Sequence, residues 1–303
     1  MCPPPGAEVG RTKIAENTSP MPRDRVYLGY SYFNGVPLTP GGTNVNRYSP
    51  GFEKTFFDRW ASFELRMPMA SSIGNNIITD GSTATGQTQF GNMVTTLKTL
   101  LIQNQNRFAL SSGLALQLPT GANTNVYDPS GNLLVKVDQR AVHFLPFLGF
   151  LYTPSDRFFL QGFSQIDIDS HGARVQMVDA LGNLTTLDRV RDQNLMYTDI
   201  GCGYWIRQRR DEYGNRTGIA PIFEFHWNKG LNSANTVQAG SVAVGTAGGG
   251  LDDMNLTLGC NFAIRRGTWA AKGCDNQDIL SHCRSEGPPV RGCWVVDLVL
   301  GKE

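Results

Sequence analysis

Between Asp24 and Arg266 the chain alternates between two kinds of connection, and this alternation constrains the fold more than any other feature. Pairs of amphipathic segments are joined by short polar turns, at residues 57–59, 103–106, 154–156, 208–216 and 265–267. Successive pairs are separated by long loops rich in Gly, Asn and Thr, at residues 35–43, 69–89, 120–140, 170–193 and 229–251. This asymmetry is typical of a membrane β-barrel, whose short turns face the periplasm and whose long loops face outward.

The segments between these connections alternate in polarity. From Met254 to Ile264 every even position is apolar and every odd position is small or polar. Because successive side chains of a strand point to opposite faces, the pattern predicts a strand with one apolar and one polar face. Residues 142–152 are apolar on both parities, which leaves their facing undecided. About eleven strands are predicted, with a possible twelfth near residues 269–274. They lie at residues 26–33, 45–56, 61–67, 93–102, 110–118, 142–152, 158–169, 196–207, 223–227, 254–264 and 290–300.

Alternation by itself is compatible with a soluble sandwich as well as with a membrane barrel. Most of the segments reach the roughly 9–11 residues that a tilted strand needs to cross a bilayer, whereas soluble strands average about 5–6 residues. Aromatic residues gather near the segment ends, as an interfacial girdle requires. They are Tyr27, Tyr48, Phe56, Trp60, Phe90, Phe108, Tyr152, Phe158, Trp227 and Trp269. We therefore predict an all-β fold, a single transmembrane antiparallel barrel of about 12 strands.

The polar face of these strands supplies the candidate site, because in a membrane barrel it lines the lumen. The positive and negative side chains are mixed, which argues against a strong preference for anions or cations. The predicted lumen-lining residues are Glu64, Arg66, Lys98, Gln161, Gln165, Asp167, Asp199, Arg207, Glu224 and His226.

The charge balance and hydropathy exclude other classes of protein. The 27 basic and 26 acidic residues leave a net charge of +1, so a nucleic-acid partner is not expected. No stretch approaches the roughly 18 apolar residues of a spanning helix. The expected partners are outer-membrane lipid and small-molecule solutes, and the oligomeric state stays open.

No set of residues forms a recognisable catalytic or metal-binding motif. Ser170 and His171 open a long loop, and Glu224 and His226 share the lumen face, where a hydrogen-bonded pair explains them. The six cysteines contain no CxxC pair, so a zinc site is not expected. We therefore predict no enzyme activity, no cofactor and no metal.

The chain is predicted to divide into a flexible N-terminal lead-in, residues 1–23, and the barrel, residues 24–303. The first residues lack the basic region and apolar run of a secretion signal, so an exported chain would be mature or begin downstream of its true start. Residues 270–303 are expected to be irregular or altered, because the strand pattern fades after Trp269 and the chain ends without a terminal aromatic residue.

Long stretches of the sequence resemble a known group of proteins. The string GNMVTTLKTLLIQNQNRFALSSGLALQLPTG at 91–121 and the string FLPFLGFLYTPSDRFFLQGFSQIDID at 144–169 are similar to planctomycete-type outer-membrane β-barrel proteins. That group is related to the outer-membrane family of the phenol meta-degradation pathway. Residues 10–36, 51–68 and 203–228 fit the same pattern, so the resemblance covers most of the chain.

The resemblance implies a location in the outer membrane and uptake of small, often apolar, compounds, with no active residue to carry over. The expected function is therefore a passive channel or uptake barrel. Two alternatives stay open. One is a structural or adhesive outer-membrane barrel with a plugged lumen, and the other is a soluble β-barrel that binds an apolar ligand.

Overall fold

The computed structural model describes residues 19–36, 43–80, 83–104, 107–210, 216–245, 252–264, 267–275 and 292–302. Every regular element within these ranges is a β-strand. The described residues contain no helix that is long and apolar enough to cross a membrane. Most of the expected lead-in, residues 1–18, lies outside the described residues.

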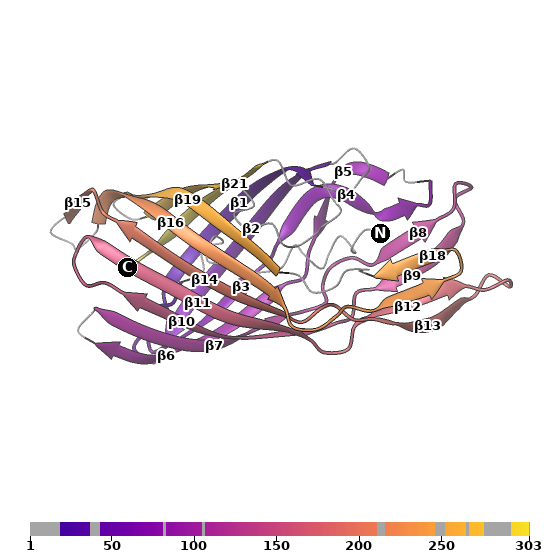
Figure 1. Cartoon of the computed structure of the whole chain (residues 1–303), viewed down its shortest axis with the longest axis horizontal. Coiled ribbons are helices and arrows are strands. Elements are labelled where there is room, and N and C mark those ends of the chain that lie inside the picture. Colours follow the sequence, from indigo (N-terminus) through magenta and orange to yellow (C-terminus); the bar gives the residue numbers. More distant parts are fainter. Residues whose placement is uncertain are drawn as a thin grey trace.

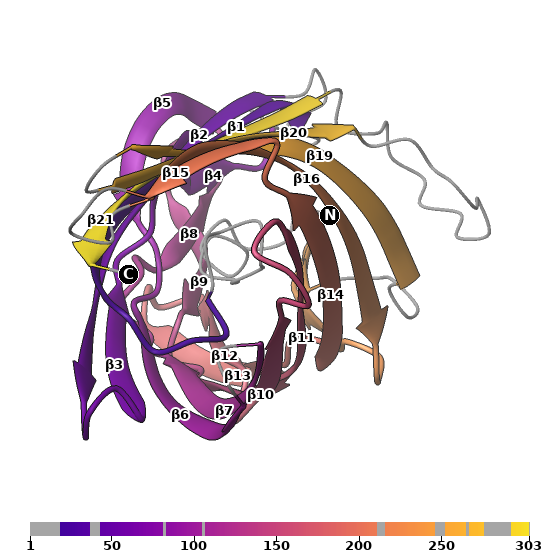
Figure 2. The same ribbon diagram turned by 90° about the vertical axis from the view of Figure 1, so that its left-hand side faces the viewer.

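Among the described residues, twelve strands pair antiparallel in a closed ring (Figures 1 and 2). The ring closes because the last strand pairs with the first, with Asp24 opposite Lys302, so the wall has no free edge. The predicted antiparallel barrel of about 12 strands is thus confirmed. In order around the ring the strands are β1 (Asp24–Val36), β2 (Thr43–Phe56), β3 (Ala61–Arg66), β6 (Val94–Asn104), β7 (Phe108–Gln117), β10 (His143–Tyr152), β11 (Phe158–Asp169), β14 (Leu195–Tyr204), β16 (Arg216–Gly230), β19 (Asp252–Ile264), β20 (Gly267–Asp275) and β21 (Gly292–Lys302).

The C-terminal part of the ring is made of β20 and β21. Their antiparallel register runs from Gly267 opposite Leu300 to Cys274 opposite Cys293. These two strands fall largely within the segment 270–303, for which the sequence pattern predicts irregular structure. Residues 276–291 of that segment lie outside the described residues, and the altered terminus stays a prediction.

Four of the expected long loops contain strand hairpins, which is a difference from the sequence interpretation. Short runs with alternating valines, such as Val135 and Val137, continue strand pairing beyond the ring because their apolar face finds a partner. Together they form an extension at the long-loop end of the barrel (Figure 1). The extra strands there are β4 (Met69–Ile78), β5 (Thr83–Phe90), β8 (Thr124–Tyr127), β9 (Leu133–Asp138), β12 (Ala173–Val178), β13 (Leu184–Val190), β17 (Thr236–Ala239) and β18 (Val242–Gly245).

The two faces of the ring are inverted relative to a water-soluble protein. Charged side chains of the inner face are buried, and Lys98 is 1% exposed. Large apolar side chains of the outer face are open, with Leu148 at 52% and Leu258 at 63%. Water would penalise an apolar surface of this extent, whereas bilayer hydrocarbon solvates it. The chain is a transmembrane β-barrel.

The same inversion settles the facing of β10, which the sequence left undecided. Its odd positions point inward, where Leu145 and Phe147 are buried, and its even positions point outward, where Phe144 and Leu148 are exposed.

Most of the expected aromatic girdle lies on the outer surface near the strand ends. Phe56, Phe90 and Tyr152 are exposed there. The prediction is wrong for Tyr27, which is buried in the lumen because it shares the inward parity of Arg25 in β1. The side chain of Trp269 lies outside the described residues.

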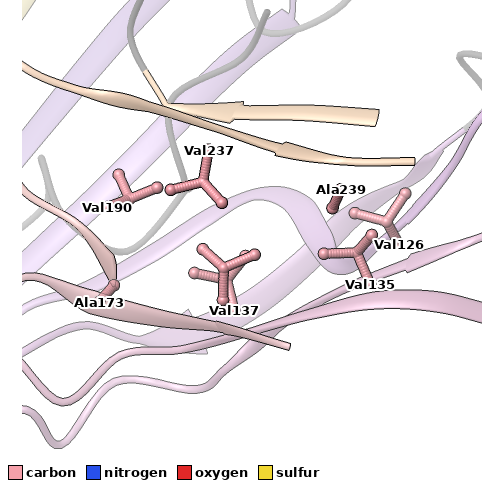
Figure 3. Packing of buried hydrophobic residues seen from close by; sticks show 8 residues of the cluster. Val126, Val135, Val137, Ala173, Val190, Val237 and Ala239 are labelled. Carbon is pink, nitrogen blue, oxygen red and sulfur yellow. The ribbon is translucent and has the colours of Figure 1, made fainter. Parts of the chain in front are cut away.

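A compact apolar core lies in the extension, where the hairpin of β17 and β18 packs over neighbouring strands (Figure 3). The hairpin forms its own two-stranded sheet and contributes Val237 and Ala239 to this core. Burial of these side chains is what holds the hairpin on the barrel. The remaining members are Val126, Val135, Val137, Ala173, Val175 and Val190.

We expect Val237→Asp to release this hairpin, because an unpaired carboxylate in an apolar core costs several kcal/mol. Limited proteolysis of the folded barrel should then cut the turn at Gly240 faster than in the wild type. The matched control is Thr236→Asp, since Thr236 is an exposed neighbour of Val237 on the opposite face of β17. Equal cleavage rates for the two variants would contradict the packing.

Candidate lumen site

Charged side chains gather on the inner wall in the half of the barrel nearest the short turns. They come from neighbouring strands, because register places Arg25 of β1 opposite Glu53 of β2, and Glu53 opposite Glu64 of β3. Lys98 of β6 is opposite Ser62. Cross-strand partners share a face, so four strands deliver their charges to one place in the lumen.

Glu53 is the centre of this ion network. One carboxylate oxygen, Oε2, lies 2.7 Å from Arg25 Nε. The other, Oε1, lies 3.0 Å from Lys98 Nζ and accepts a hydrogen bond of 2.6 Å from Ser62 Oγ. Because all four side chains are buried, each charge depends on these partners instead of on water.

Glu64 forms the second node of the network. Arg66 Nη2 lies 3.0 Å from Glu64 Oε1, and Arg66 Nε donates to the Tyr27 hydroxyl at 3.0 Å. The same hydroxyl donates to Glu64, while the guanidinium carbons of Arg25 and Arg66 lie 4.8 and 5.4 Å from the centre of the Tyr27 ring. Gly51 is opposite Tyr27 and leaves room for this ring, because a Cβ there would lie 2.5 Å from it.

A second polar cluster on the inner wall centres on His226 of β16. Its Nδ1 lies 2.5 Å from Asp199 Oδ1, and its Nε2 lies 3.1 Å from Thr257 Oγ1 and 3.6 Å from Glu224 Oε2. The acid, the histidine and the hydroxyl are arranged as in the catalytic triad of hydrolases, with the histidine between the other two. However, Glu224 competes for the same imidazole nitrogen, and Thr257 is buried against the wall. The cluster is better explained as a group of buried polar side chains that interact with one another on the inner wall.

The mouth of the lumen, where the ring joins the extension, holds a third polar cluster, centred on His143. His143 Nδ1 lies 2.7 Å from Asp167 Oδ1, and His143 Nε2 lies 3.8 Å from Asp192 Oδ2. The pair of His143 and Asp167 joins the first residue of β10 to the end of β11, next to the start of the extension.

Asp138 of the extension lies beside this mouth and outside the spanning strands. Arg174 Nε donates to its Oδ2 at 3.1 Å, and Lys136 Nζ lies 3.3 Å from its Oδ1. Burial alone would raise the pKa of Asp138, but the hydrogen bonds from Arg174 and Lys136 outweigh it and lower the pKa below its usual value. A lowered pKa stabilises the fold above the unfolded pKa, and this contribution is lost as the pH falls through the folded pKa.

Between the polar clusters the inner wall carries an apolar stripe. The rings of Phe147 and Phe163 have centroids 5.9 Å apart, and those of Phe159 and Trp205 have centroids 6.3 Å apart. The rings lie flat along the wall because glycines stand opposite them on the neighbouring strands, where a Cβ would come within 2.8 Å of the ring. Those glycines are Gly113, Gly149 and Gly203.

Nearly all of the predicted lumen residues lie on the inner face. Gln161 is partly buried, and Arg207 is the exception, because it is exposed on the outer surface. The buried members are Glu64, Arg66, Lys98, Gln165, Asp167, Asp199, Glu224 and His226.

The exception at Arg207 has a local cause. Ile206 donates its backbone N–H to Ile219, and Arg207 is also registered opposite Ile219. Two consecutive residues of one strand therefore lie opposite a single residue of its neighbour. This is a β-bulge, and it reverses the parity of the residues that follow. Sequence parity alone does not reveal this extra residue.

Several residues of the site were not among the predicted positions. The sequence carried a signal for them, since Arg25, Tyr27 and Glu53 occupy the same parity as the small residues of β1 and β2. His143 was hidden because both parities of its strand are apolar. The others are Ser62, Thr257, Phe147, Phe159, Phe163 and Trp205.

No known protein family matches the chain, and no curated protein matches it. Among solved structures, the β domain of the Bordetella autotransporter BrkA is similar, with a TM-score of 0.47 and 12% identity over 92% of this chain and 100% of that chain. A deletion mutant of the monoaromatic hydrocarbon channel TodX is similar with a TM-score of 0.45 and 8% identity, over 95% of this chain and 93% of that chain.

Proposed function

We propose that the protein is an outer-membrane β-barrel through which small molecules, apolar ones included, enter the cell envelope by diffusion. The observation that carries the proposal is the apolar stripe of Phe147, Phe163, Phe159 and Trp205 along a lumen that also carries polar clusters. Aromatic rings on the inner wall offer a contact surface to an apolar solute. The polar clusters offer hydrogen-bonding partners to water and to the polar groups of a solute. The short turns would face the periplasm and the extension would face outward.

The ion network around Glu53 and Glu64 would form the constriction of this path. Its charges pair with one another, so the network imposes little net field on a passing ion. Mixed charge of this kind fits a passive channel without strong ion preference. The relation to the phenol-pathway family stays part of this proposal.

A structural or adhesive barrel with a plugged lumen is the second candidate. The observation that favours it is the burial of the whole ion network, since Arg25, Glu53, Glu64, Arg66 and Lys98 are all covered. A soluble barrel is disfavoured by the exposed apolar outer face.

We expect the purified barrel to show discrete conductance steps in a planar lipid bilayer, and Phe147→Ala to increase the step size. Removing the ring widens the lumen where Phe147 and Phe163 meet. Phe144→Ala is the matched control, because Phe144 lies on the outer face of the same strand. A silent wild type would favour the plugged barrel, and an equal effect of the two variants would exclude the stripe from the path.

The location in the outer membrane has its own test. A folded membrane barrel migrates differently on a gel before and after boiling, and it requires detergent for extraction. A protein that stays monodisperse in plain buffer would contradict the assignment.

A further inference from the structure

An open cleft lies on the outside of the barrel at the short-turn end. Its volume is about 870 Å³. Three arginines and three apolar side chains dominate its lining, and none of the described residues that line it is acidic. The six are Arg157, Arg207, Arg209, Ile206, Ile219 and Phe262.

The bulge at Ile206 and Arg207 is what places Arg207 and Arg209 in this cleft. Beyond the bulge, Arg207 and Arg209 of β15 (Arg207–Arg210) are registered opposite Ile219 and Thr217. Ile219 lies on the outer parity of β16, so the two arginines share the outer face. Without the extra residue they would point into the lumen.

The cleft combines an apolar surface with positive charge. An anionic lipid has the complementary parts, which are apolar chains and a negative headgroup. Ile206 and Phe262 are exposed where the apolar outer face of the barrel ends. The arginines lie beside them at the rim, at the depth of the lipid headgroups. A guanidinium group binds a phosphate oxygen pair through two parallel hydrogen bonds, so adjacent arginines favour a phosphodiester.

We propose that this cleft binds the headgroup phosphate of an anionic phospholipid, with the acyl chains lying against Ile206 and Phe262. In the proposed function the short turns face the periplasm, so the lipid would belong to the periplasmic leaflet. This one statement rests on the proposed function. The binding itself requires only the transmembrane barrel, and it does not depend on whether the lumen conducts.

The test uses the full-length barrel folded in detergent, with phosphatidylglycerol and phosphatidylcholine as probes and native mass spectrometry as the readout. We expect the wild type to retain phosphatidylglycerol in preference to phosphatidylcholine. Arg207→Gln combined with Arg209→Gln should weaken phosphatidylglycerol binding by roughly twentyfold, since each arginine near an anionic headgroup contributes about a fivefold effect.

The matched control is Arg59→Gln combined with Arg107→Gln, which removes the same charge from exposed arginines of the same rim outside the cleft. The control should bind phosphatidylglycerol like the wild type, and heat-modifiable migration verifies that both variants are folded barrels. An equal loss in both double variants would overturn the site in favour of general rim charge. Displacement of the lipid by millimolar inorganic phosphate would overturn it in favour of a simple anion site.

Discussion

Glu53→Gln is expected to lower the free energy of unfolding of the barrel by about 3–5 kcal/mol, because it leaves Lys98 and Arg25 buried without their shared carboxylate. The measurement is a urea titration of the barrel folded in lipid vesicles. Removing the cation as well, in Glu53→Gln with Lys98→Met, should recover part of the loss because no ammonium group is then left without its carboxylate.

Lys54→Gln is the matched control for this prediction. Lys54 is the next residue of β2, and its side chain is 72% exposed in a pair with Asp24. An exposed ion pair contributes at most about 1 kcal/mol, so the control should unfold almost like the wild type. If Glu53→Gln were equally mild, the charges of the network could not depend on one another, and water would have to solvate them.

Leu258→Arg is expected to destabilise the barrel by about 2–4 kcal/mol, although Leu258 is 63% exposed. Leu258 lies at the middle of β19, so its side chain meets the centre of the bilayer, where a guanidinium loses its hydration. The measurement is again the free energy of unfolding from lipid vesicles.

The control is Leu181→Arg at the tip of the turn between β12 and β13. Leu181 is 87% exposed, but it belongs to the extension, which water surrounds in the proposed orientation. We expect a change close to zero there. Similar small effects at the two leucines would mean that β19 faces water, and the membrane assignment of the outer face would fail.

Much of the architecture could be predicted from local sequence. The alternation in residues 254–264 identifies both the strand β19 and its two faces, because side-chain direction in a strand has a period of two residues. The same rule placed Glu224, His226 and Asp199 on the inner wall. It failed at Arg207, where a single extra residue reverses the parity.

The candidate site was predictable only in part. Parity says that Glu64 and Lys98 point inward, but it does not say which charge each of them meets. The loops were also underestimated, since a four-residue strand such as β17 carries too little pattern to be recognised before its partner β18 and the core around Val237 are known.

The sequence by itself determined a barrel of about twelve strands, its two unequal ends and its polar inner face, because these follow from periodicity and loop length. Only the tertiary structure decided how the charges pair. Glu53 meets Arg25 and Lys98, which lie 28 and 45 positions away in the chain, and cross-strand register alone brings them within hydrogen-bonding distance. The bulge that turns Arg207 outward is likewise a property of pairing between strands, which no single strand encodes.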